Sequence, residues 1–446
     1  MSGSPITAIR AQLIDFVADP GDSMSDDCGA LRYAPDGLLI LRDGRVVERG
    51  PAAELLGKLP SHCPVIDRRP CIVMPGFVDL HVHYPQIDVI ASPGRDLLDW
   101  LERYTFPAER RFSDTDHARD AAERFLDELL ANGTTTALAF GTVHRGSIDT
   151  FFEAARARQL RMVAGKVMMD RNCPEDLRDT PDQAYRDSRE LLERWHGVDR
   201  LGYAITPRFA ITSSPEQLAA AGRLAREHPS AWIHSHLSEN ADEVDWVARL
   251  FPQARSYLGV YEQFGLLRDR AVYAHCIWLD RGDRARMAAQ GAVAAFCPTS
   301  NLFLGSGLFD LAATDEAGLR FGVATDVGGG TSFSMLRTLA EAWKVAQLQG
   351  QKLSPLRAFY LATLGGARAL GLADRIGRLE PGYEADLVVL DPKATPLAAQ
   401  RDRLCKSVTE RLFALMMLGD DRSIAETWIL GRPWRGRTPI RAAPAA

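Results

Sequence analysis

Eight short apolar segments alternate with amphipathic helical patterns through the middle of this chain of 446 residues, and this alternation constrains the fold more than any other feature. The eight expected strands are residues 76–83, 134–140, 161–168, 202–207, 231–236, 271–275, 292–296 and 321–325. Strands that alternate with helices are typical of βαβ units with parallel strands. Eight such units over roughly 300 residues match the size of a TIM barrel with insertions. The sequence therefore predicts an α/β fold, a (β/α)8 TIM-like barrel.

A doubly wound open sheet is the other fold that this alternation allows. No GxGxxG loop follows the first expected strand, although dinucleotide-binding sheets carry one at the start of their first helix. In a barrel, the active site lies at the C-terminal ends of the strands. The polar residues at those ends are His81 and His83 on the first strand, Arg208 after the fourth, His236 on the fifth, His275 on the sixth and Asp326 after the eighth. Their positions favour the barrel and predict the place of its active site.

Strand patterns also occur near both ends of the chain. They lie at residues 37–42, 45–48, 386–391 and 426–430. The first two are joined by Asp43-Gly44, a typical hairpin turn. Strands at both ends of a different middle predict a small β-sandwich domain that is built from the two termini. We expect the two parts of this domain at residues 1–72 and 377–446, and the barrel at residues 73–376.

The composition is that of an ordinary globular enzyme, and it excludes two classes of partner. The net charge of −5 argues against nonspecific nucleic-acid binding, which needs a basic surface. No apolar run approaches the length of a membrane helix, and the first residues lack a secretory signal pattern. The seven cysteines include no CxxC pair, which indicates reduced thiols. We therefore expect a cytoplasmic protein that binds neither nucleic acid nor membranes.

Residues 75–86, PGFVDLHVHYPQ, predict a metal site at the end of the first barrel strand. Side chains two residues apart on a strand point to the same side, so His81 and His83 face one point together. An HxH pair on a surface hairpin often has no role, but packing explains such a pair poorly at the end of a buried barrel strand. With a third histidine and a carboxylate from other strands, the pair matches a catalytic zinc site that activates water.

The fifth strand offers two histidines for the same metal. His234 and His236 share a face, so the period of the strand alone allows either to be the ligand. His236 lies nearer the C-terminal end of the strand and is the predicted ligand, whereas we expect His234 to pack below it. Glu239 follows three residues later and is expected to move a proton between water and substrate. A role as an acid at a helix N-terminus is compatible with this function.

Two further residues complete the predicted site. Asp326 stands between a buried strand and the glycines 328–330, where packing gives a carboxylate no role, and it is the predicted fourth ligand. His275 either holds a second metal or hydrogen-bonds to the attacking water. A second metal usually needs a bridging group, such as a carboxylated lysine at the end of the fourth strand; the sequence has Arg208 there, and Lys166 is on the third strand. We therefore expect one zinc ion per chain, held by His81, His83, His236 and Asp326.

The pattern of HxH, His, His and Asp on strands one, five, six and eight resembles the amidohydrolase superfamily. Residues 377–388, GRLEPGYEADLV, are similar to the signature of its C-terminal β domain. Within the superfamily the resemblance is to enzymes that hydrolyse guanine, and it runs over nearly the whole chain. It rests on residues 83–86 (HYPQ), 98–101 (LDWL), 104–109 (YTFPAE), 206–209 (TPRF), 236–240 (HLSEN) and 325–327 (TDV). His234 departs from the pattern, because an amide side chain is expected there.

The resemblance implies hydrolysis of guanine to xanthine and ammonia, with attack of water on C2 and with Glu239, Asp326 and His275 as catalytic residues. It implies a substrate site formed by His83, Gln86, Arg208, Phe209 and Trp100. The amide of Gln86 offers a donor and an acceptor to a purine edge, and the guanidinium of Arg208 suits the O6 and N7 side of guanine. The rings of Phe209 and Trp100 are candidate stacking faces. Similar enzymes are commonly homodimers, which we expect here as well.

Two other functions are compatible with parts of the pattern. A related amidohydrolase that acts on 8-oxoguanine or on s-triazines would share the metal site but have different polar groups in its pocket. The HYPQ segment together with Arg208 argues against that function. A non-catalytic barrel with a structural or interaction role would have lost metal ligands, whereas this sequence retains all of them and also Glu239.

Overall fold

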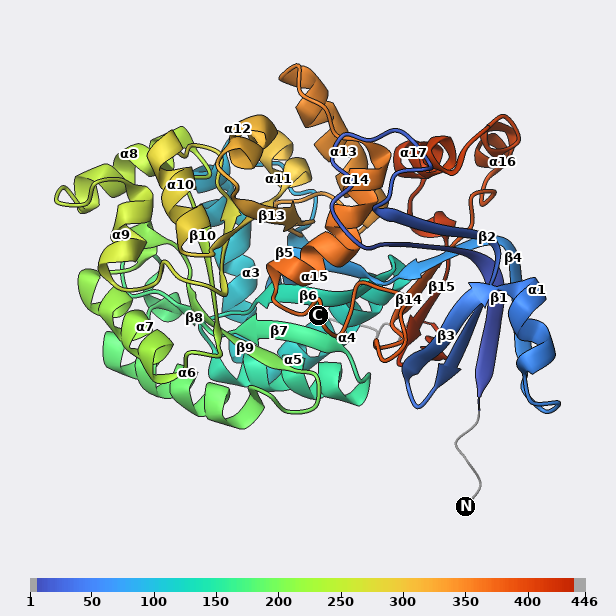
Figure 1. Cartoon of the computed structure of the whole chain (residues 1–446). Coiled ribbons are helices and arrows are strands. Elements are labelled where there is room, and N and C mark those ends of the chain that lie inside the picture. Colours follow the sequence, from blue (N-terminus) through green and yellow to red (C-terminus); the bar gives the residue numbers. More distant parts are fainter. Residues whose placement is uncertain (1–5, 437–446) are drawn as a thin grey trace. The chain divides into compact units, whose positions relative to one another are not determined.

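The structure is a computed structural model, and it describes residues 6–436 (Figure 1). This part of the chain divides into two compact units. One contains residues 6–78, 129–136 and 334–436, and the other contains residues 79–128 and 137–333. The expected domain boundaries near residues 72 and 376 stay predictions. The outermost parts of the expected terminal pieces, residues 1–5 and 437–446, lie outside the described residues.

All eight expected barrel strands form, and they follow one another around one sheet in chain order. They are β5 (Phe77–His83), β6 (Thr134–Phe140), β7 (Arg161–Gly165) with its short continuation β8 (Val167–Met168), β9 (Gly202–Pro207), β10 (Trp232–Leu237), β11 (Ala271–His275), β12 (Val293–Phe296) and β13 (Arg320–Val323). The pairs from β7 to β13 are parallel. The barrel closes where β5 meets the residues after β13, because Asp326 N donates to His81 O over 2.9 Å and His83 N to Val327 O over 2.7 Å. The predicted TIM-like barrel is therefore confirmed.

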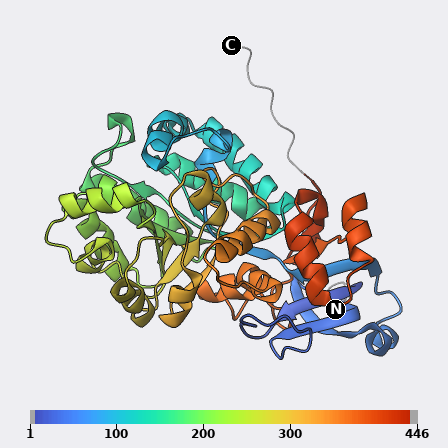
Figure 2. The same ribbon diagram turned by 90° about the horizontal axis from the view of Figure 1, so that it is seen from above.

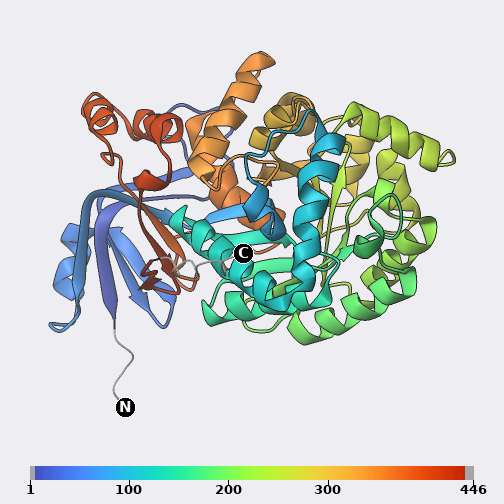
Figure 3. The same cartoon turned by 180° about the vertical axis from the view of Figure 1, so that it is seen from behind.

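The barrel strands are apolar on both faces because both faces are covered. Every residue of β6 and β10 is buried, which matches strands packed between a core and an outer layer of helices. Helices α5 (Arg145–Ala157), α6 (Pro181–Trp195) and α7 (Pro215–Glu227) lie side by side on the outside of the strands (Figures 1 and 3). Both α6 and α7 begin with a hydroxyl side chain that caps a backbone N–H, followed by proline at the first helical position.

The longest of the remaining helices near the barrel is α4 (Thr115–Ala131). The shorter ones are α2 (Leu97–Trp100), α3 (Phe106–Arg110), α8 (Ala241–Leu250), α9 (Tyr257–Gln263), α10 (Arg281–Ala289), α11 (Pro298–Phe303) and α12 (Leu311–Glu316). The 3-10 turn η2 (Tyr84–Val89) continues β5, and the π-helical turn η3 (Leu101–Thr105) joins α2 to α3. Single π-helical turns are frequent near functional sites.

Strands from both termini form the second sheet, as predicted. Its order is β16-β15-β14-β4-β1-β2-β3, and most of its neighbours are antiparallel. The strands are β1 (Thr7–Phe16), β2 (Leu31–Arg42), β3 (Arg45–Pro51), β4 (Val65–Pro75), β14 (Leu387–Leu390), β15 (Ile424–Ile429) and β16 (Arg432–Pro433). The apolar cluster that holds this sheet together draws on both ends of the chain, for example Ile9, Val73, Leu387 and Trp428.

The hairpin predicted from Asp43-Gly44 joins β2 to β3. Both turn residues have positive φ, 53° and 74°, which is the backbone that a two-residue turn between twisted strands requires. The same unit contains α1 (Ala52–Leu55), α13 (Met335–Leu348), α14 (Pro355–Tyr360), α15 (Gly366–Ala369), α16 (Pro396–Asp402) and α17 (Val408–Leu418). Helices α16 and α17 lie side by side (Figure 2). All seven cysteines are free thiols. Within residues 6–436, no helix is both long and apolar enough to cross a membrane.

Candidate active site

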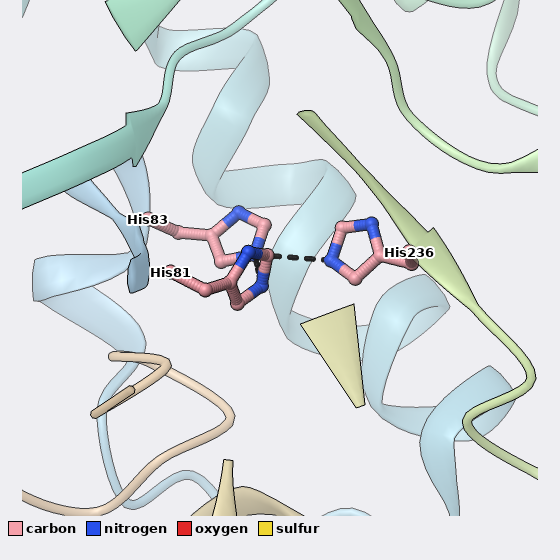
Figure 4. A group of neighbouring side chains, drawn as sticks. All are labelled: His81, His83 and His236. Carbon is pink, nitrogen blue, oxygen red and sulfur yellow. Dashed lines mark hydrogen bonds between the residues drawn. The ribbon is translucent and has the colours of Figure 1, made fainter. Parts of the chain in front are cut away.

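Three histidine side chains point their Nε2 atoms at one place inside the barrel. His81 and His83 come from β5, where alternate residues share a face, and His236 comes from β10 (Figure 4). Nε2 of His83 lies 3.1 Å from Nε2 of His81 and 3.2 Å from Nε2 of His236. Burial lowers the pKa of all three imidazoles well below the usual range, so each ring is neutral with a lone pair to offer. This geometry fits a bound metal cation.

Asp326 adds a carboxylate to the three imidazoles. It follows β13, and its Oδ1 lies 3.1 Å from His81 Nε2 and 3.4 Å from His83 Nε2. Burial raises its pKa to about 6, and a bound cation would favour the ionised form. Histidine nitrogens with one carboxylate oxygen form a ligand set that suits zinc and similar transition metals. The structure thus brings together all four predicted ligands.

The second histidine of β10 occupies a different position from His236. Nε2 of His234 lies 2.7 Å from Nδ1 of His81, on the far side of that ring from the metal position. Nδ1 of His236 lies 2.7 Å from the Arg208 carbonyl oxygen and donates to it, which leaves Nε2 free as a ligand. In this arrangement His236 points into the cluster and His234 lies behind His81; the choice of His236 as the metal ligand stays a prediction.

Glu239 and His275 lie beside the ligand cluster. Oε2 of Glu239 is 3.2 Å from His275 Nε2, and Oε1 accepts a hydrogen bond from Ser306 Oγ over 3.0 Å. Burial, with a smaller contribution from the charge of Asp326, raises the pKa of Glu239 to about 8. A carboxyl group with this pKa exchanges protons readily at neutral pH. His275 is in turn oriented by Asn301, whose Oδ1 lies 2.9 Å from His275 Nδ1.

The loops after the strands hold these groups in unusual backbone conformations. Ser238, His275 and Asp326 have φ values of 52°, 73° and 50°, in the left-handed region that residues other than glycine rarely adopt. The loop at Ser238 is fixed by α8, where Asn240 and Glu243 form a capping box. Left-handed residues cluster at active sites, where the surrounding contacts maintain them.

A pocket with an empty volume of about 380 Å³, including its opening to solvent, lies over the cluster. Its walls include every predicted site residue except His81, namely His83, Gln86, Trp100, Arg208, Phe209, His236, Glu239, His275 and Asp326. Leu97, Leu101 and Leu304 complete the apolar part of the wall. Three of the predicted substrate contacts are polar, His83, Gln86 and Arg208, and these residues are at most 3% exposed.

Several residues at this site carried no role in the sequence interpretation. Ser306 and Asn301 touch Glu239 and His275, and Glu109 accepts two hydrogen bonds from Arg208. Glu109 lies in the YTFPAE segment that contributed to the family resemblance, and its place in that segment was the signal that could have found it. Ser306 and Asn301 had no comparable signal, because serine and asparagine are common in loops.

Comparisons with known proteins show the family to which the chain belongs. Residues 72–433 match the amidohydrolase family. The chain is 50% identical over 433 residues to guanine deaminase of Escherichia coli K12, covering 97% of this chain and 98% of that protein. A solved structure of E. coli guanine deaminase has a TM-score of 0.93 at 49% identity and covers 97% of this chain and 100% of the other. Guanine deaminase from C. acetobutylicum with bound guanine has a TM-score of 0.85 at 28% identity, covering 96% and 99%.

Proposed function

Because the chain belongs to the amidohydrolase family, we infer that it catalyses the hydrolytic deamination of guanine to xanthine and ammonia. Its relatives at 50% and 42% identity are a guanine deaminase and a probable guanine deaminase. The observation that supports this function best is a buried cluster of three imidazoles and a carboxylate, with Glu239 beside it, that opens into a pocket lined by Arg208 and Gln86.

We propose zinc as the metal, with one ion per chain held by His81, His83, His236 and Asp326. When bound, zinc activates water for attack at neutral pH. A second ion would need a further bridging group, and β9 is followed by Arg208 in place of a lysine. Lys166 is paired with Asp179 and so is engaged elsewhere.

The residues of the chain then move protons around C2 of guanine. Glu239 takes a proton from the attacking water and delivers it to the ring nitrogen beside C2. His275 lies 3.2 Å from Glu239 Oε2 and 3.7 Å from Asp326 Oδ2, so it is placed to hydrogen-bond the water between those carboxylates. Asp326 helps to pass the second proton to the amino group. The bond from C2 to that nitrogen breaks, ammonia leaves, and the oxygen stays as the 2-oxo group of xanthine.

The polar pocket groups select the base. Arg208 presents N–H donors to O6 and N7 of guanine, and Gln86 contacts the same edge. Phe209 and Trp100 supply ring faces; the indole N–H of Trp100 already donates to Ser92 O over 3.1 Å, so the ring serves as an apolar face. His83 contacts the substrate from the metal side. The homodimer and the cytoplasmic location stay predictions.

A substrate panel tests this function. We expect the zinc-loaded protein to release ammonia from guanine with xanthine as product, and to release little from adenine or cytosine. Adenine carries an amino group where guanine has O6, and a site built to hydrogen-bond one group rejects the analogue without it by roughly 10⁴-fold. The variant Glu239→Gln, purified and loaded in the same way, is the control for contaminating activity. Efficient turnover of 8-oxoguanine or of an s-triazine, with guanine untouched, would overturn the substrate assignment.

A further inference from the structure

One buried carboxylate lies behind Gln86 and Arg208, two of the polar side chains that line the substrate pocket. Glu109, on α3, has no exposed surface. Its Oε1 and Oε2 accept from Arg208 Nη1 over 2.9 and 2.8 Å, and Oε1 lies 3.5 Å from Gln86 Nε2. The two side chains that contact Glu109 come from η2 and from the end of β9, so Glu109 is the point at which these two parts of the pocket wall meet.

The contacts also leave a defined set of donors for a ligand. Gln86 Oε1 accepts from Gly328 N over 3.2 Å, which fixes the orientation of the amide and keeps its N–H₂ on the Glu109 side. The Arg208 guanidinium lies 5.6 Å from the centre of the Phe106 ring, which restricts it further. Of the Arg208 nitrogens, only Nη1 donates to Glu109. Within residues 6–436, no protein acceptor contacts Nε or Nη2 of Arg208. Those N–H groups are available to a bound base.

We propose that Glu109 is a positioning residue that sets the hydrogen-bond polarity of the pocket and thereby its choice of a 6-oxo purine over a 6-amino purine. This rests on the function proposed above. An ionised carboxylate only accepts hydrogen bonds, so every side chain that contacts Glu109 must turn a donor toward it. A neutral amide in its place both donates and accepts, so it no longer requires Arg208 to turn a donor toward it. Arg208 would also lose the charge that holds its guanidinium in the plane of the substrate.

The experiment compares guanine with 2,6-diaminopurine, which carries an amino group in place of the C6 oxygen and keeps the reacting group at C2. The ratio of their kcat/KM values is measured for the wild type, Glu109→Gln and Glu109→Asp. Both substrates see the same preparation, so the ratio is independent of how much of each variant is folded and metal-loaded. We expect Glu109→Gln to raise KM for guanine and to lower the ratio at least tenfold, whereas Glu109→Asp, which keeps the charge, retains part of the preference.

Asp127→Asn is the matched control. Asp127 is a buried carboxylate paired with Arg158 over 3.0 Å, and it contacts neither Arg208 nor Gln86. Its substitution should leave the ratio within about twofold of the wild type, although it neutralises a buried carboxylate beside an arginine, as Glu109→Gln does. A ratio that falls equally in Asp127→Asn would show that the loss does not depend on the contacts of Glu109 with Arg208 and Gln86, and it would overturn the inference.

A double variant separates action through Arg208 from any other effect of Glu109. Arg208→Met with Glu109→Gln leaves no unpaired buried charge, so it is expected to fold even if Glu109→Gln alone does not. If Glu109 acts through Arg208, adding Glu109→Gln to Arg208→Met changes the ratio less than threefold. The inference is overturned if Glu109→Gln and Glu109→Asp both keep the wild-type ratio, or if Glu109→Gln lowers the ratio equally with and without Arg208. A wild-type protein that leaves guanine untouched would instead overturn the proposed function.

Discussion

Nε2 of His234 lies 2.7 Å from Nδ1 of His81, and both rings are completely buried. Because Nε2 of His81 faces the predicted metal position and needs its lone pair there, Nδ1–H of His81 is the donor in this contact and Nε2 of His234 is the acceptor. A histidine that ligates a metal almost always donates its other ring N–H in this way. His234 thus takes the place of the amide side chain that the family resemblance led us to expect.

Substitution of His234 should weaken metal binding without abolishing it. We expect His234→Ala to lower the affinity for zinc about 10- to 100-fold, the usual effect of removing such a partner. His234→Gln should recover most of the affinity, because the amide oxygen accepts the same hydrogen bond, and His236→Ala should lose the ion. Zinc affinity is measured by competition with a chromogenic chelator. Loss of the ion in His234→Ala with retention in His236→Ala would exchange the roles of the two residues.

The purified protein should contain about one zinc ion per chain, because the two groups of candidate ligands among the described residues, His81-His83-His236 and His81-His275-Asp326, share His81, whose Nε2 can bind only one ion. Removal of the ion by a chelator should abolish ammonia release from guanine, and one equivalent of zinc should restore it. Elemental analysis of the purified and the reconstituted protein gives the stoichiometry. Two tightly held ions per chain would contradict the mononuclear assignment and would make His275 a ligand of the second ion.

Glu239→Gln should leave zinc and substrate binding in place but reduce kcat by about 10²- to 10⁴-fold, the range expected for loss of a general acid–base group. The amide still accepts the hydrogen bond from Ser306, so the loop should keep its conformation. Zinc content, the dissociation constant of the product xanthine and single-turnover rates together separate binding from chemistry. A near-normal kcat would contradict the proton-transfer role and would leave Glu239 only the role of an acid near the N-terminus of α8.

The strand-end residues could be predicted because a short sequence pattern determines where they point. The period of two on β5 aims His81 and His83 at one place, and a barrel brings the ends of all its strands to one face. The alternation of strands and helices likewise predicted all eight barrel strands. The interruption of the third strand at Lys166 could not be predicted, because a buried lysine pairs with Asp179 there through a tertiary contact.

The contacts between loops could not be predicted from sequence spacing. Glu109 and Arg208 are 99 residues apart, and Ser306 and Glu239 are 67 residues apart. Neither pair shares a strand or a helix, so no periodicity relates their directions. Only the closed barrel brings the residues that follow different strands together, and both the contact of Ser306 with Glu239 and the role proposed for Glu109 depend on that closure.

Glu243 predicts a pH dependence of stability. It is fully buried, and its carboxyl oxygens accept from Glu239 N over 2.9 Å, from Asn240 N over 3.1 Å and from Tyr257 Oη over 2.6 Å. Burial, and then the charge of Glu239, raise its pKa from 4.5 to about 7. At pH values between about 4.5 and 7, Glu243 is protonated in the native state but has lost its proton in the unfolded chain. The contribution of Glu243 is therefore most favourable below about pH 4.5 and is lost as the pH rises through about 7.

Glu243→Gln should remove this loss, because the amide does not titrate and still caps the loop with its oxygen. Relative to the wild type, the variant should become more stable as the pH rises from 5 to 8, by on the order of 1–3 kcal/mol in the free energy of unfolding. Unfolding midpoints of the metal-free proteins at several pH values give this difference, and the metal-free state avoids mixing it with the pH dependence of zinc binding. A difference that is constant over this range would mean that Glu243 titrates with an ordinary pKa, and that its capping hydrogen bonds offset its burial.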